Sequence, residues 1–160
     1  MRFLWFGKKK APQILAPEVE IARTPVEVFS VSGFVIESNP VPGNKNTELS
    51  HGTINSMILS VLSEASSPAD VAAQEFFQER GANVLPINSY SFSAERGFSS
   101  RVVDGAITRT VLIGPVEAIS RATTPFCPSI AAATQSSPES FVVAIDGIAY
   151  AAFTLRSELV

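Results

Sequence analysis

The spacing of apolar residues changes at Gly81, and the change separates two kinds of predicted element. Before it, apolar side chains recur at i, i+3, i+4, i+7 and i+8, at Ile54, Met57, Ile58, Val61 and Leu62. This spacing places all of them on one face of a helix, which we predict over residues 53–64. After Gly81 the spacing changes to a period of two, which is typical of strands.

A second helix is predicted from residue 68 to residue 80. Ser67 is a favourable N-cap residue, and Pro68 suits the first helical position. Asp70 is favourable near the positive end of the helix dipole, and Gly81 ends the helix.

The residues before the helices predict a strand, a loop and an arm. Residues 26–36 are rich in β-branched and aromatic side chains, which favour a strand. Residues 37–50 combine Pro, Asn, Gly and Ser and predict a loop. Residues 1–25 contain three prolines and a lysine triplet, so we expect an extended N-terminal arm before a single domain of residues 26–160.

The second half of the chain predicts two hairpins, each centred on an Asp-Gly pair. Their strands are expected at residues 98–103 and 107–113, and at 141–145 and 148–155. Between the hairpins, Gly114-Pro115 opens a short helix to about Ser120, and residues 123–138 are ambiguous, with room for a helix around 129–134. Because hairpin-connected strands alternate with helices, the predicted class is α+β, with a twisted, mainly antiparallel sheet flanked by helices.

Composition fits a compact globule and argues against several partners. The chain has 160 residues, of which 46% are apolar, and a formal net charge of −3. It offers no concentrated basic face, so nucleic acid is a poor candidate ligand. No apolar run approaches the roughly 18 residues that cross a bilayer. We therefore expect a cytoplasmic protein without a transmembrane segment.

No set of residues predicts catalysis or a metal site. The only histidine, His51, lies at the start of a predicted helix without a cluster of Cys, Asp or Glu around it in sequence, and the single Cys127 rules out a cysteine cluster. Neither a Gly-x-Ser-x-Gly elbow nor a P-loop occurs. Asp104 and Asp146 each precede Gly in a predicted tight turn. Asp is favoured in such turns because it tolerates the turn conformation and its side chain bonds to the nearby backbone. We therefore predict no catalytic residues and no metal ligands.

Four segments, taken in order, resemble the nucleotide-binding (N) domain of P-type cation-transporting ATPases. That domain has a helix pair, a Phe-Ser strand, a turn containing Gly before an acidic residue, and a final hairpin. Here the matching segments are SSPADVAA (66–73), FSAERGFS (92–99), LIGPVEAI (112–119) and the final hairpin (141–159). The resemblance covers roughly residues 54–159. It implies the same twisted antiparallel sheet and an adenine nucleotide, ATP, as ligand.

The resemblance implies a binding role for five residues. Phe92 corresponds to the aromatic residue that stacks on adenine, and Asp70 to the acidic residue near the adenine amino group. Arg96 corresponds to the basic residue of the Phe-Ser strand. Gly114 would leave room for the ring, and Glu117 closes that turn.

Two positions depart from the family pattern. Gly97 and Ile113 stand where the family often has lysine, and the loss of two cations removes charge-assisted contacts to phosphates. Ser67 also stands where the heavy-metal pumps of the same superfamily have histidine. The expected binding is therefore weak and driven by adenine, with little preference among ATP, ADP and AMP. The Asp-Lys-Thr-Gly-Thr phosphorylation loop is absent from the sequence, so we expect no catalysis or transport by this chain alone.

An alternative is a non-catalytic interaction or regulatory module. The two missing lysines, together with the aromatic and basic segment of residues 3–10, suggest docking onto a membrane protein through the sheet or the arm. A membrane transporter or a parent pump is the candidate partner in that case.

Overall fold

Six strands form one open sheet in the computed structural model, which describes residues 24–160. The order across the sheet is β1-β6-β5-β4-β3-β2. The strands are β1 (Glu27–Ile36), β2 (Ile87–Ser93), β3 (Gly97–Asp104), β4 (Ile107–Pro115), β5 (Phe141–Ile145) and β6 (Ile148–Leu159). The pairs from β2 to β6 are all antiparallel. The predicted α+β class and both Asp-Gly hairpins are confirmed.

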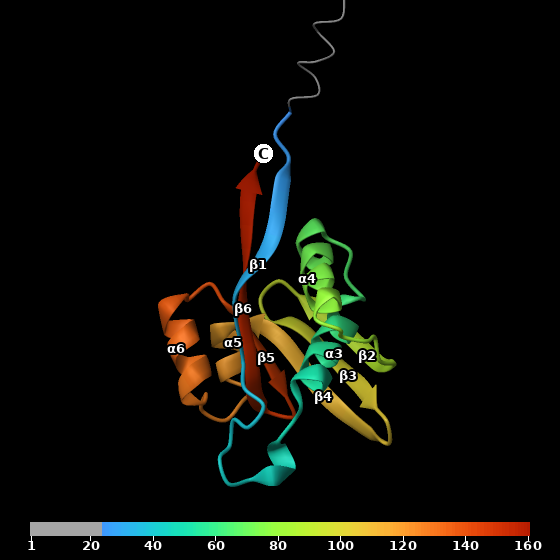
Figure 1. Cartoon of the computed structure of the whole chain (residues 1–160), viewed down its shortest axis with the longest axis vertical. Coiled ribbons are helices and arrows are strands. Elements are labelled where there is room, and N and C mark those ends of the chain that lie inside the picture. Colours follow the sequence, from blue (N-terminus) through green and yellow to red (C-terminus); the bar gives the residue numbers. More distant parts are fainter. Residues whose placement is uncertain (1–23) are drawn as a thin grey trace, which may run out of the picture. The chain divides into compact units, whose positions relative to one another are not determined.

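Helices cover both faces of the sheet. Helices α3 (His51–Leu62) and α4 (Pro68–Glu79) lie on one face, and α5 (Val116–Ser120) and α6 (Pro128–Ser136) lie on the other (Figure 1). A 3-10 turn, η1 (Lys45–Thr47), precedes α3. The first two helices begin and end within two residues of the predicted bounds. Each begins at a serine cap, Ser50 or Ser67, whose hydroxyl oxygen accepts a hydrogen bond from a backbone N–H of the first turn.

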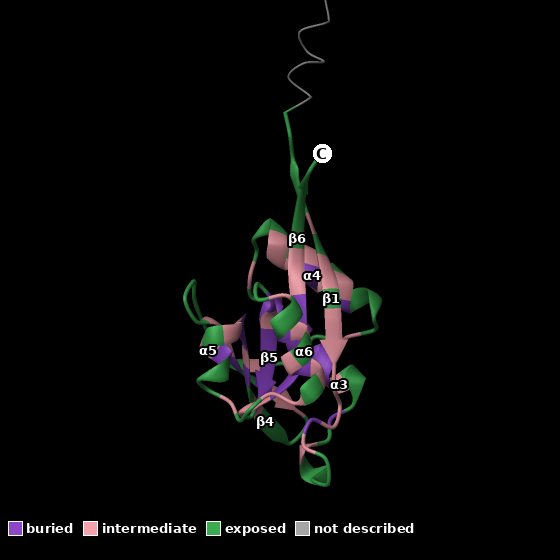
Figure 2. Cartoon of the chain, turned by 90° about the vertical axis from the view of Figure 1, so that its left-hand side faces the viewer, coloured by how far each residue is buried: buried purple, intermediate pink, exposed green. Residues whose placement is uncertain are grey.

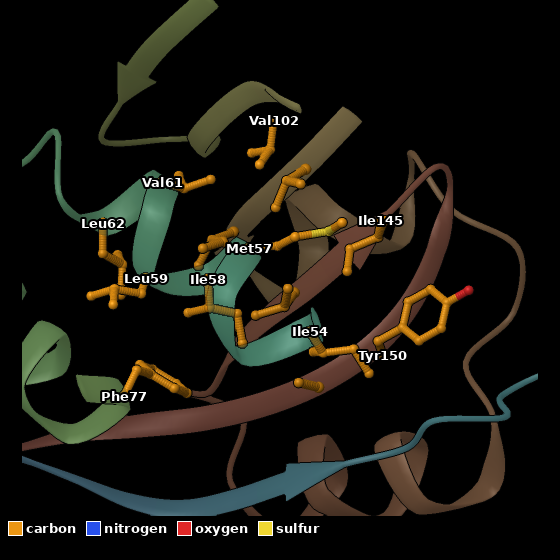
Figure 3. Close-up of a cluster of buried hydrophobic side chains, with 14 of the residues drawn as sticks. Ile54, Met57, Ile58, Leu59, Val61, Leu62, Phe77, Val102, Ile145 and Tyr150 are labelled. Carbon is orange, nitrogen blue, oxygen red and sulfur yellow. The ribbon is translucent and has the colours of Figure 1, made fainter. Parts of the chain in front are cut away.

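The main core lies between α3 and the sheet, where buried apolar side chains of α3 pack against β3, β5 and β6 (Figure 3). Every residue of α3 from Ile54 to Leu62 is buried, although its sequence predicted only one apolar face. The reason is that α3 contacts α4 as well as the sheet, and Phe77 of α4 belongs to the same core and touches Phe153 of β6. Two serines of α3, Ser56 and Ser60, are also buried. The Ser56 and Ser60 hydroxyls accept hydrogen bonds from the backbone N–H groups of Asn83 (3.0 Å) and Leu85 (2.7 Å), which fixes the segment leading into β2.

A second core lies on the other face, beneath α5 and α6. It contains six buried apolar residues: Ile119, Ile130, Val142, Ala144, Ala149 and Ala152. Because both faces of the sheet are covered at its centre, β5 is buried along nearly its whole length (Figure 2). This explains why β5 reads as a continuous apolar run rather than an alternating one.

Strand β2 was not predicted as a separate element. It lies beside β3 at one edge of the sheet, with β1 at the other edge, and most of its side chains are exposed. A register shift between Ile87 and Ser89 interrupts its alternation of apolar and polar residues. With the alternation broken and few side chains buried, the sequence carried little signal for this strand.

The turn between β5 and β6 is fixed by Asp146. This residue has a positive φ of 52°, and Gly147 follows with a φ of 82°, as a tight two-residue hairpin turn requires. The Asp146 carboxylate accepts a hydrogen bond from the Thr110 backbone N–H (3.0 Å) and pairs with Arg109 (2.9 Å). The predicted structural role of Asp146 is confirmed, and its side chain also ties the turn to β4.

The chain divides into two compact units. Of the described residues, the first unit contains 24–28 and 158–160, in which the backbones of Val26 and Val160 exchange two hydrogen bonds (3.1 and 3.0 Å). The second unit contains residues 29–157. Apart from its last two residues, the predicted N-terminal arm lies outside the described residues. Within residues 24–160, no helix is both long enough and apolar enough to cross a membrane.

Candidate functional site

A cavity of about 630 Å³ lies between the β2–β3 hairpin and α5. Its walls come from three segments that the fold brings together: the hairpin, one residue of β4, and α5 with the two residues after it. The lining residues are Ser91, Phe92, Ser93, Glu95, Arg96, Gly97, Phe98, Ser99, Leu112, Ala118, Ile119, Arg121 and Ala122.

Alternation along the strands gives the hairpin two different faces. Ser91 pairs with Ser99, and Ser99 pairs with Leu112, so these side chains form one row across the sheet. Leu112 packs against the core beneath α5, which places the serine row on the α5 face. Phe92 and Phe98 form the adjacent pair and therefore point to the opposite face, where Phe98 joins the core beneath α3.

Of the five predicted binding residues, Phe92 and Arg96 line this cavity. Phe92 is 57% exposed, and its ring centroid lies 4.7 Å from that of Phe98. Arg96 lies in the hairpin turn, and its backbone N–H donates a hydrogen bond to the Ser93 hydroxyl (3.0 Å). Asp70, Gly114 and Glu117 do not line the cavity, and a binding role for them stays a prediction.

Asp70 lies on the α3–α4 side of the sheet, at the start of α4. Its backbone N–H donates to the Ser67 hydroxyl (3.1 Å), and its carboxylate accepts from the same hydroxyl (2.6 Å). It also lies close enough to Tyr90 to affect it. Burial raises the pKa of the Tyr90 hydroxyl, and the negative charges of Asp70 and Glu64 raise that pKa further. Asp70 therefore has a capping role and an electrostatic link to the aromatic face of the hairpin.

Replacing Asp70 by asparagine is expected to lower the pKa of Tyr90, because a nearby carboxylate disfavours the phenolate. A pH titration followed by the NMR signal of the Tyr90 ring carbon that bears the hydroxyl measures this. Glu75→Gln removes an equal charge from an exposed position on the same helix and should leave the pKa of Tyr90 unchanged. An unchanged pKa in Asp70→Asn would mean that Asp70 does not face this ring.

Gly97 and Gly114 allow two backbone segments to touch. Gly97 has a φ of +85°, and a Cβ there would lie 2.2 Å from the Ile113 carbonyl oxygen. A Cβ on Gly114 would lie 2.3 Å from the Arg96 carbonyl oxygen. Real side chains do not tolerate such distances, so the start of β3 and the end of β4 meet only because both residues are glycine. The space that Gly114 leaves free is taken by the hairpin backbone.

Ile113, the other departure from the family pattern, is a core residue. Its side chain is 1% exposed and belongs to the cluster beneath α3. On the two neighbouring strands it pairs with Phe98 and Val143. A lysine at this position would direct its stem into apolar packing, so the absence of the family lysine follows from the way this sheet is packed.

Arg121 lines the cavity but was not among the predicted binding residues. It follows the last residue of α5, is exposed, and lines the cavity together with Arg96 and Glu95. Sequence could have indicated it only as a cation at the end of a predicted helix. Its position beside a hairpin some 25 residues earlier depends on β4 returning along β3.

Comparison with known proteins places the fold. No protein-family model and no curated protein matches the sequence. Among solved structures, the N-domain of HMA6, a copper-transporting P-type ATPase, matches with a TM-score of 0.58 at 15% identity. The match covers 80% of this chain and 98% of that one. The fold is that of a P-type ATPase N-domain.

Larger proteins contain the same N-domain fold. A zinc-transporting PIB-type ATPase matches with a TM-score of 0.58 at 15% identity, over 83% of this chain and 20% of that chain. The catalytic domain of the CPx-ATPase CopB-B matches with a TM-score of 0.53 at 15% identity, over 81% of this chain and 38% of that chain. The present chain therefore spans only a minor part of these two proteins.

Proposed function

We propose that this N-domain-like protein binds an adenine nucleotide weakly and by itself carries out neither phosphoryl transfer nor transport. The observation that supports binding is the cavity, which has a volume typical of small-molecule sites and is lined by both Phe92 and Arg96. A flat base and an anionic chain are the two parts of a nucleotide, and these side chains suit one part each.

Phe92 provides the stacking surface at the edge of the sheet. Its ring lies on the face opposite the serine row, so a base stacked on it would sit against edge strand β2, with its phosphate chain passing around this edge into the cavity. An aromatic ring that is more than half exposed on an edge strand is free to cover a base, and contact with Phe98 restrains its orientation. Stacking of a base on an aromatic side chain contributes about 1–3 kcal/mol in nucleic-acid systems. By itself this contribution corresponds to a dissociation constant of several millimolar or weaker, which fits the predicted weak affinity.

Arg96 provides the cation. It forms no ion pair within residues 24–160, where the one salt bridge joins Arg109 to Asp146. Its position is nevertheless restrained, because the backbone hydrogen bond to Ser93 closes the hairpin turn. A guanidinium carried on this turn at the rim of the cavity can donate two parallel hydrogen bonds to a phosphate.

Phe92→Ala is expected to weaken ATP binding about tenfold, since it removes the stacking surface. The measurement is an NMR titration with ATP, followed through the backbone amides of residues 91–99. Ile107→Ala is the matched control, because Ile107 is also an exposed apolar residue of the sheet but does not line the cavity. Wild-type spectra that do not change at millimolar ATP would end the proposal, and ATP hydrolysis above the buffer rate would end its non-catalytic part.

A further inference from the structure

We propose that Arg121, acting with Arg96, forms a phosphate-binding end of the cavity and makes binding depend on the number of phosphate groups. The inference rests on the proposed nucleotide site and assigns a ligand group to a residue that the sequence did not indicate.

The first observation is the position of Arg121. It caps the C-terminal end of α5 with helical backbone angles, and its neighbours Ala118 and Ala122 line the same cavity wall. Both neighbours have minimal side chains, so the guanidinium is the dominant polar group on this wall. Arg96 approaches the cavity from the hairpin, which gives a cation on each side of it.

The second observation is that Arg121 has no competing partner. Glu117 lies one turn earlier, at the spacing that favours a salt bridge on a helix. The pair is nevertheless not formed, since residues 24–160 hold a single salt bridge, between Arg109 and Asp146. The Arg121 guanidinium therefore keeps all its donors for a ligand.

The third observation is the polar floor between the two arginines. The hydroxyls of Ser91 and Ser99 belong to one row on the α5 face and line the cavity. Neither hydroxyl is bonded to another residue of the described chain, so both can donate to phosphate oxygens. Glu95 is the only carboxylate of the lining, so the cavity residues carry one net positive charge and favour an anion.

This arrangement changes the expected ligand preference. Sequence reasoning counted only the two missing lysines and predicted little preference among ATP, ADP and AMP. With Arg121 included, two cations flank the cavity, so affinity should rise from AMP to ADP to ATP. Inorganic tripolyphosphate should bind to the same residues without adenine.

The test compares the affinities of AMP, ATP and tripolyphosphate for wild type, Arg121→Gln, Arg121→Lys and Arg156→Gln at one fixed ionic strength. Arg156→Gln removes an equal charge from an exposed position on β6 outside the cavity. Wild type should bind ATP about tenfold more tightly than AMP, as a charge-assisted contact implies. Arg121→Gln should remove most of this preference and leave AMP binding unchanged, Arg121→Lys should keep part of it, and Arg156→Gln should keep all of it.

The outcomes separate this inference from the proposed function. Equal binding of AMP and ATP by wild type, or the same loss in Arg156→Gln as in Arg121→Gln, overturns the role of Arg121 and leaves nucleotide binding intact. If neither nucleotide binds, the proposed function fails. In that case, tripolyphosphate binding to wild type that Arg121→Gln abolishes would still support the phosphate site. If wild type does not bind tripolyphosphate either, the inference about Arg121 fails together with the proposed function.

Discussion

Replacing Ile113 by lysine is expected to lower the free energy of unfolding by at least about 4 kcal/mol. The side chain is 1% exposed and belongs to the apolar core beneath α3. The substitution removes buried apolar contacts and forces an ammonium group either to lose its hydration or to disrupt the packing of Phe98 and Val143 on either side. Urea unfolding followed by far-UV circular dichroism measures the change.

Ile107→Lys is the control for this experiment, because Ile107 lies on the same strand and is 52% exposed. Its effect should stay within about 0.5 kcal/mol. Equal stability of the two variants would show that the strand does not bury Ile113 as described. The expected loss of stability also means that a phosphate contact cannot be added by placing the family's lysine at position 113.

Gly97→Ala is expected to lower the free energy of unfolding by about 3 kcal/mol, the sum of a backbone and a steric cost. The backbone cost arises because alanine disfavours a φ of +85°. The steric cost arises because its Cβ would lie 2.2 Å from the Ile113 carbonyl oxygen. The start of β3 and the end of β4 would therefore have to separate. Thermal and urea unfolding of the purified variant measure the sum.

Gly43→Ala isolates the steric part of this cost. Gly43 has a φ of +86°, almost the same as Gly97, but a Cβ there meets no atom within 4 Å. Its alanine variant should therefore lose only the backbone cost of about 1–2 kcal/mol. If the two variants are equally destabilised, the close contact at Gly97 is not a constraint, and a longer side chain such as lysine would be tolerated there too.

Local patterns predicted most of the fold because the elements concerned each carry a strong signal of their own. The apolar spacing of Ile54 to Leu62 identified α3, and the Ser67-Pro68 cap located the start of α4 to the residue. The two Asp-Gly pairs fixed both hairpins. Strand β2 escaped because its bulge breaks the period of two and because an exposed edge strand needs few apolar residues.

The candidate site was less predictable, because its walls come from segments that meet only after folding. Phe92 and Arg96 were found through the family resemblance, and both line the cavity. Arg121 was missed since nothing local distinguishes it from any other charged residue after a helix. Gly97 was interpreted as a lost lysine, whereas its positive φ and its contact with the Ile113 carbonyl depend on the pairing of β3 with β4.

The position of β1 in the sheet has a consequence for how the chain assembles. β1 joins β6 through contacts such as the one between the Ser32 and Thr154 hydroxyls (2.6 Å), which are 122 residues apart in sequence. The other strand pairs are neighbours along the chain or are separated only by α5 and α6. Closing so long a loop costs more chain entropy than any other pairing in the sheet. We therefore expect β1 to join the sheet late, on a β6 that the rest of the sheet has already ordered.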